Sequence, residues 1–262
     1  MEKLKFERPV INKINAGMPD KFGMRTHIIP VTRIDDIPVK DIIEQFGSPV
    51  YVLSEKTIRS VYQEALSAFT TRYSKVQFAW SYKTNYLNAV CRVYHQEGSW
   101  AEVVSGFEYN KAIANGVPGN KIIFNGPDKS KDDLKKAIEK GSLIHIDHFD
   151  ELYDCMQIAK DAGKKAKVAI RVNMDTGIYP QWDRFGFNYE NGEAWNAVNK
   201  IMPDENMELS GLHTHIGTYI MTPGAYAVAT SKLAQLAVRI EKKYSHHINA
   251  DDFVSKLECD LY

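Results

Sequence analysis

The chain has 262 residues, of which 44% are hydrophobic and 25% are charged, a composition typical of a folded globular protein rather than a disordered one. Its 33 basic and 33 acidic residues balance, so there is no electrostatic reason to expect a nucleic-acid or membrane-surface partner. The sequence contains no apolar run of membrane-spanning length, and its first twenty residues lack the apolar core of a signal peptide. Three widely spaced cysteines favour a reducing compartment, and we expect a cytoplasmic protein.

Proline and glycine interrupt residues 1–45, which show no regular hydrophobic period. We therefore predict an irregular N-terminal extension over 1–45 and a folded domain over 46–262. Ser54 is suited to cap the first helix of this domain. Apolar residues then recur at the spacing of one buried helical face: Ile58, Val61, Tyr62, Ala65, Leu66 and Phe69.

After this helix, short apolar segments suited to β-strands alternate with helical segments. Six predicted strands start near Val76, Ser99, Lys121, Leu143, Lys167 and Glu208. The first five start at intervals of 22 to 24 residues, and a segment from Leu257 could supply a seventh strand. Strands and helices that alternate at this length predict a parallel sheet.

Two architectures share this alternation: a closed (β/α)8 barrel of the TIM type and an open, doubly wound sheet. Segment 76–83 distinguishes them, because its bulky residues fall on one face and its small or polar residues on the other. A doubly wound sheet should be apolar on both faces. We therefore predict an α/β barrel whose helices pack outside. With only six to seven strands in the chain, we expect it to be incomplete at the C-terminus.

The predicted strands end in polar or ionisable residues, and in a βα barrel these ends carry the reacting groups. They are Lys83, Glu102, Ser105, Asn125, His145, Asp147, Arg171, Asn173, His213 and His215. Lys83 could be a solvated surface charge or a partly desolvated amine able to form a Schiff base. Alternation along a strand places His213 and His215 on one face, and likewise Arg171 and Asn173.

The His213-x-His215 pair has three interpretations. Both residues could be core histidines, or they could bind a metal together with His145 and Asp147. In the third interpretation, an imidazole stacks on a planar cofactor ring, and the glycine and threonine that follow bring backbone N–H groups near a phosphate. The residues alone leave all three open.

Seven segments in register resemble motifs of the fold-type III decarboxylases that depend on pyridoxal 5'-phosphate (PLP). They are WSYKTN, AEVVSGFE, KIIFNGPDKS, IHIDHFDEL, VAIRVN, RFGF and GLHTHIGT. The resemblance covers about residues 46 to 220, and the opening FGSPVYVLS is most similar to the diaminopimelate decarboxylases among the diaminopimelate, ornithine and arginine decarboxylases. The chain departs from the family in having Glu102 for Asp and Thr218 for Ser, and both changes keep the functional group.

The resemblance implies a PLP-binding barrel like that of alanine racemase, and a carboxy-lyase acting on diaminopimelate or a related diamino acid in lysine biosynthesis. Lys83 would be the catalytic residue and would form the Schiff base with PLP. His215 would stack on the cofactor ring, and the next two residues of the motif would approach its phosphate. The implied cofactor-binding residues are Lys83, Glu102, Arg171, His215, Gly217 and Thr218. No metal site is implied.

The family continues after this region with a glycine triad, an acid that pairs with the pyridinium nitrogen, and a C-terminal β domain. We therefore expect residues 1–262 alone to be inactive or nearly so, and the full-length protein to be a homodimer. One alternative is a non-catalytic PLP-binding protein, either similar to the PLP-homeostasis proteins or a pseudoenzyme. Another is a metal-dependent hydrolase that uses His213 and His215.

Overall fold

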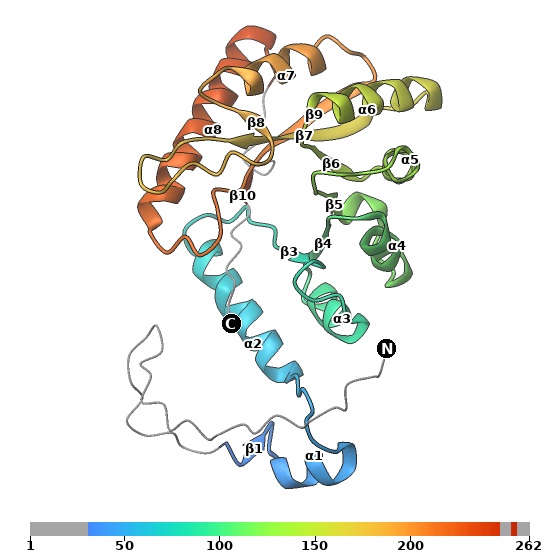
Figure 1. The fold of residues 1–262 in the computed structure, drawn as a ribbon, viewed down its shortest axis with the longest axis vertical. Helices are drawn as coiled ribbons and strands as arrows, with labels where there is room; N and C mark the ends of the chain where they lie inside the picture. The colour runs from blue at the N-terminus through green and yellow to red at the C-terminus, as the bar shows by residue number, and fades with distance from the viewer. Residues whose placement is uncertain (1–30, 247–252, 256–262) are drawn as a thin grey trace, which may run out of the picture. The chain divides into compact units, whose positions relative to one another are not determined.

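The computed structural model describes residues 31–246 and the strand at 253–255 (Figure 1). The chain forms two compact units, Met1–Ser54 and Glu55–Tyr262. In the described part of the first unit, strands β1 (Arg33–Ile34) and β2 (Ile37–Pro38) form an antiparallel hairpin, and helix α1 (Val39–Phe46) follows. Asp35 and Asp36 both have positive φ, as tight hairpin turns require. Residues 33–45 are therefore regular, and the prediction of an irregular segment there is wrong.

The second unit alternates helices with strands. Its α-helices are α2 (Glu55–Thr70), α3 (Asn88–Gln96), α4 (Gly106–Ala114), α5 (Lys131–Lys140), α6 (Phe149–Ala162), α7 (Glu193–Ile201) and α8 (Pro223–Tyr244). Its strands are β3 (Ala79–Ser81), β4 (Trp100–Val103), β5 (Ile122–Phe124), β6 (Leu143–Ile146), β7 (Ala166–Asn173), β8 (Phe187–Asn188), β9 (Met207–Thr214) and β10 (Phe253–Ser255). A 3-10 helix, η1 (Gly119–Lys121), precedes β5. None of the helices described is both long enough and apolar enough to cross a bilayer.

Seven strands form a parallel sheet in the order β10-β9-β7-β6-β5-β4-β3, and β8 pairs with β7 outside this path. Apart from β8, the order follows the chain without the reversal that a doubly wound sheet requires. In Figure 1, helices α3 to α8 lie along one side of the sheet, as the barrel prediction expects. The described residues include no pairing between β3 and β10, so the sheet is an open part of a barrel-type arrangement. The strand predicted from Leu257 lies outside the described residues.

Local sequence signals set the ends of these helices. The side chains of Ser105 and Ser130 cap α4 and α5 by accepting backbone N–H groups at 3.3 and 3.2 Å. Gly141 and Gly163 end α5 and α6 in the left-handed conformation, with φ of 70° and 59°. Because α4 begins soon after β4, and α6 soon after β6, these connections are short and hold the polar strand ends in place.

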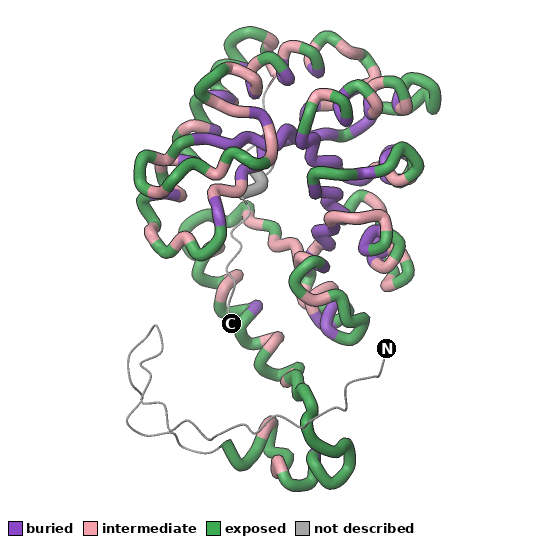
Figure 2. Tube along the Cα trace, in the orientation of Figure 1, coloured by how far each residue is buried: buried purple, intermediate pink, exposed green. Residues whose placement is uncertain are grey.

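Alternate residues of strands β4 to β7 face the helices and build the core, and Figure 2 shows buried residues concentrated along these strands. In β7, the side chains of Val168, Ile170 and Val172 are fully buried in the main apolar cluster. The intervening positions near the end of the strand are Arg171 and Asn173, which alternation turns to the opposite face. We call the helix-covered side the outer face and the other side the inner face.

Candidate active site

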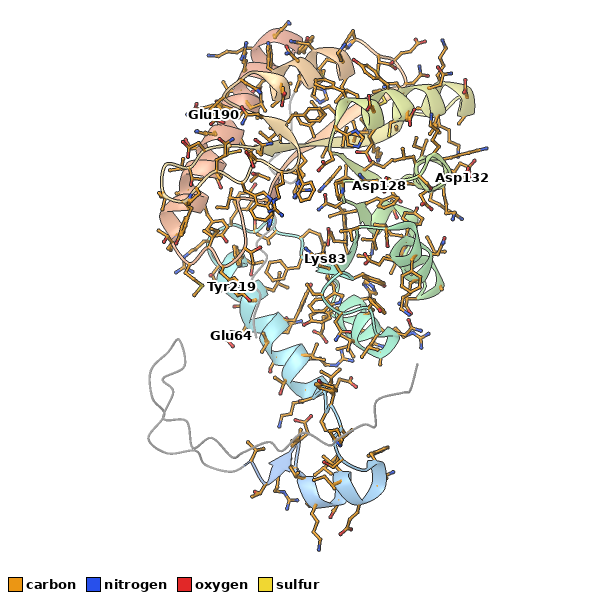
Figure 3. The ribbon with its side chains drawn as sticks, viewed as in Figure 1. Glu64, Lys83, Asp128, Asp132, Glu190 and Tyr219 are labelled. Atoms are coloured by element: carbon orange, nitrogen blue, oxygen red, sulfur yellow. The ribbon has the colours of Figure 1, made fainter. Side chains whose placement is uncertain are left out.

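Lys83 lies in the turn that follows β3, two residues after Ser81 (Figure 3). A tight turn carries the lysine: Thr84 donates its backbone N–H and its hydroxyl to the Ser81 carbonyl, at 3.1 and 2.8 Å. The Lys83 side chain is exposed. This exposure favours the solvated interpretation of Lys83 over that of a partly desolvated amine.

Glu102 lies beside Ser81 on the neighbouring strand, and its side chain is buried. Its Oε1 accepts a hydrogen bond of 3.0 Å from Nδ2 of Asn125, so two of the predicted strand-end residues meet. The hydroxyl of Ser81 and Oδ1 of Asn125 are also buried, and neither has a hydrogen-bond partner within the described chain. Buried polar atoms are almost always hydrogen-bonded, so this part of the inner face suits a polar ligand.

Asp147 and Arg171 form an ion pair on the inner face. Nη1 of Arg171 lies 3.0 Å from Oδ1 of Asp147, and the two side chains are 9% and 6% exposed. The guanidinium group also lies over the ring of Phe185, 4.9 Å from its centroid. The ion pair and the aromatic contact together hold one positive charge at a defined place between β6 and β7.

The two histidines of β9 have different surroundings. His213 lies beside Arg171 in the sheet register, is fully buried, and stacks on His145 with ring centroids 4.4 Å apart. This geometry favours the core interpretation for His213. His215 comes after the end of the strand and is half-buried, and its ring makes a T-shaped contact with Trp182, with the ring centroids 6.0 Å apart. Gly217 follows with a φ of +130°, a conformation that favours glycine.

The structure brings the predicted strand-end residues together in three pairs: Glu102 with Asn125, Asp147 with Arg171, and His145 with His213. These pairs give the inner face a band of polar side chains from β4 to β9. One predicted residue has a different role, since Ser105 caps a helix. Among the described residues, no group of three or more His, Cys, Asp or Glu side chains is arranged to hold a metal ion.

Sequence reasoning missed a buried ion pair at this edge of the sheet, between the loop before α5 and the first turn of α6. Nζ of Lys129 lies 2.6 Å from Oε1 of Glu151 and also donates to the backbone carbonyls of Gly126 and His145, at 2.6 and 2.9 Å. Oε2 of Glu151 accepts the backbone N–H of Asp147 at 2.8 Å. Burial raises the pKa of Glu151, although the charge of Lys129 acts against this shift. The pair thus fixes the backbone of the residue that binds Arg171.

The sequence shows each residue only in its own local setting, near the start of a helix, and does not indicate that the two form a pair. Lys129 stands next to the serine that caps α5, and Glu151 is the third residue of α6. Each is typical of a solvated helix start, and 22 residues separate the two along the chain. Only the fold shows that they meet.

Chemically, the inner face combines an accessible primary amine, a fixed guanidinium group and imidazole rings. A primary amine condenses with the carbonyl group of a cofactor or substrate. The buried polar groups nearby can orient a polar molecule attached to that amine. The arrangement therefore suits covalent binding of a small, polar carbonyl compound.

Residues 56–253 match the family model described as pyridoxal-dependent decarboxylase, pyridoxal binding domain. The diaminopimelate decarboxylase of Methanocaldococcus jannaschii is 30% identical over 225 residues, which are 80% of this chain and 51% of that protein. The Bacillus subtilis enzyme of the same name is 28% identical over 225 residues, 82% of this chain and 50% of that protein.

The chain is also similar in structure to solved diaminopimelate decarboxylases. The M. jannaschii diaminopimelate decarboxylase in complex with L-lysine has a TM-score of 0.77 and 30% identity, covering 83% of this chain and 53% of that one. The chain spans about half the length of the curated relatives that it matches.

Proposed function

The chain belongs to the pyridoxal-dependent decarboxylases, whose cofactor is PLP, and on that premise we propose that it decarboxylates a diamino acid. Diaminopimelate or a close relative is the proposed substrate, because the relatives reported above carry that enzyme's name. We place the PLP-binding domain at residues 46–262, after an extension at 1–45, in a protein that forms a homodimer at full length. The observation that carries the proposal is the accessible amine of Lys83 beside a band of buried polar groups.

The residues present suit PLP. Lys83 offers a primary amine for the aldehyde of the cofactor, and His215 offers an imidazole for its ring. Gly217 and Thr218, directly after β9, offer backbone N–H groups for the phosphate. The buried Ser81 hydroxyl, which has no hydrogen-bond partner in the described chain, adds a polar group on the same face as Lys83.

When bound, PLP supplies an electron sink for the electrons that remain on the substrate after CO2 leaves. The protein's task is to hold the cofactor and to orient the substrate. Lys83 would hold the cofactor through Nζ, and His215 would pack against its ring. Arg171, paired with Asp147 at 3.0 Å, and Glu102, bonded to Asn125 at 3.0 Å, keep opposite charges at fixed places on the inner face.

The test begins with the absorbance spectrum of the purified protein after addition of PLP. We expect the spectrum of protein-bound PLP in the wild type and its loss in Lys83→Ala. The matched control is Lys121→Ala, which removes an exposed lysine at the opposite end of the strands. Release of CO2 from diaminopimelate, lysine, ornithine and arginine then tests the activity.

The outcomes separate the proposed function from its alternatives. Release of CO2 from a diamino acid, dependent on Lys83, supports the decarboxylase. PLP binding without CO2 release from any of the four amino acids agrees both with the inactivity expected for residues 1–262 alone and with a non-catalytic PLP-binding protein, and the same CO2 assay on the full-length protein distinguishes these two. A wild-type spectrum without bound PLP would contradict both.

A further inference from the structure

A buried polar network centred on Tyr82 lies behind the turn that carries Lys83. The Tyr82 side chain is fully buried, and its hydroxyl lies 2.9 Å from Nε2 of His95. The same hydroxyl oxygen accepts a hydrogen bond of 3.2 Å from Nδ2 of Asn115. His95 is in the last turn of α3 and Asn115 caps the end of α4, so two helices hold this one phenol.

The direction of each hydrogen bond follows from the chemistry of the groups. Nδ1 of His95 lies 2.8 Å from the carbonyl oxygen of Ser99, and because a carbonyl can only accept, Nδ1 carries the proton of the neutral ring. Nε2 must then accept the hydroxyl proton of Tyr82. Burial lowers the pKa of His95 and raises that of Tyr82, so both groups stay neutral, as this pattern requires.

Tyr82 connects this network to the lysine. It directly precedes Lys83 in the chain, and its backbone N–H donates to the carbonyl of Glu102 at 2.9 Å, which extends the ladder between β3 and β4. The turn from Ser81 to Thr84 then directs Lys83 to the inner face, while the phenol stays on the outer face. The hydroxyl of Tyr82 is therefore an anchor on the side of the sheet opposite to the lysine amine.

We propose that Tyr82 is a positioning residue for Lys83: its hydroxyl, held by His95 and Asn115, fixes the turn from which the amine reaches the cofactor. This inference rests on the proposed function, which assigns Lys83 as the attachment residue. Without the hydroxyl, the ring still packs but the turn is less restrained. The amine then spends less time in the orientation that captures PLP.

The experiment compares Tyr82→Phe with Tyr109→Phe. Tyr109 is also fully buried, and its hydroxyl makes a 2.8 Å hydrogen bond to Ser142, so each variant loses one buried phenol hydroxyl. The rate of PLP capture is followed by absorbance, and stability is measured by denaturant unfolding. We expect Tyr82→Phe, which loses the hydrogen bonds to both His95 and Asn115, to capture PLP about fivefold more slowly. Tyr109→Phe should lose similar stability and capture PLP at the wild-type rate.

Equal capture rates for the two variants would overturn the inference, because the hydroxyl of Tyr82 would then be only structural. If Tyr82→Phe does not fold, His95→Leu replaces it, since leucine offers no acceptor to the Tyr82 hydroxyl and leaves Tyr82 intact. Slow capture by His95→Leu supports the inference, and a wild-type rate overturns it. Failure of the wild type to attach PLP at Lys83 would contradict the proposed function as well. Attachment by the wild type together with equal capture rates in the two variants would contradict the positioning role of Tyr82 alone.

Discussion

The two faces of the parallel sheet are built from alternate residues of the same strands, yet they contain different chemistry. On the outer face, Ile170 is fully buried in the apolar cluster under the helices. On the inner face, its neighbour Arg171 pairs with Asp147, and His213 lies beside it in register. A step of one residue along β7 thus separates a position that stabilises the fold from one that serves the site. Substitutions on the two faces should therefore have separable effects on stability and on cofactor binding.

The largest loss of stability is expected where charged side chains, rather than apolar ones, are fully buried. Lys129 and Glu151 bury a charge pair at the strand ends, with side chains 0% and 2% exposed. Lys129→Met leaves the carboxylate of Glu151 buried without its partner, and we expect a loss of about 3–5 kcal/mol in the free energy of unfolding, measured with denaturant. The double variant Lys129→Met, Glu151→Gln removes both charges and should recover most of this loss. A single variant within about 1 kcal/mol of the wild type would contradict the interpretation.

A smaller loss is expected on the outer face. Ile170→Ala leaves a cavity under the helices and should reduce the free energy of unfolding by about 2–5 kcal/mol, while the folded variant still attaches PLP. Lys167→Ala is the control on the same strand, because Lys167 is exposed and its loss should change stability by no more than about 0.5 kcal/mol. Loss of PLP attachment by folded Ile170→Ala would break the proposed separation between the faces.

The smallest effect is a dependence of stability on pH. Burial lowers the pKa of His95 in the folded chain below its ordinary value of 6.5, so the unfolded chain binds the proton more readily. The contribution of this group to stability is complete above pH 6.5 and is lost as the pH falls from there through the folded-state pKa. Unfolding measured across this range should show a shallower decline for His95→Gln than for the wild type. Identical slopes for the two proteins would show that His95 does not contribute.

Much of the architecture could be predicted because it depends on local repetition. The spacing of strands and helices predicted the parallel sheet, and alternation placed Arg171 and His213 on the face where the register confirms them. Serine before α5 and glycine after it are local signals that mark the ends of that helix. These features depend on residues that are only a few positions apart, so they can be predicted from the sequence alone.

The parts that could not be predicted depend on residues far apart in the chain. Lys129 meets Glu151, and Tyr82 meets Asn115, across 22 and 33 residues, and nothing local to either residue of a pair indicates its partner. The exposure of Lys83 depends on the turn from Ser81 to Thr84, which the strand pattern does not specify. Strand β8 is only two residues long, too short to show an alternating pattern.

The most direct test of the account is to locate PLP on the chain. The complex of the purified protein with PLP is reduced with borohydride and digested with a protease. The masses of the peptides are then measured by mass spectrometry. The account predicts that the pyridoxyl mass is found on the peptide that contains Lys83, and that Lys83→Ala abolishes it while Lys121→Ala does not. A label distributed over other lysines, or the same label in Lys83→Ala, would contradict the assignment of the inner face as the cofactor site.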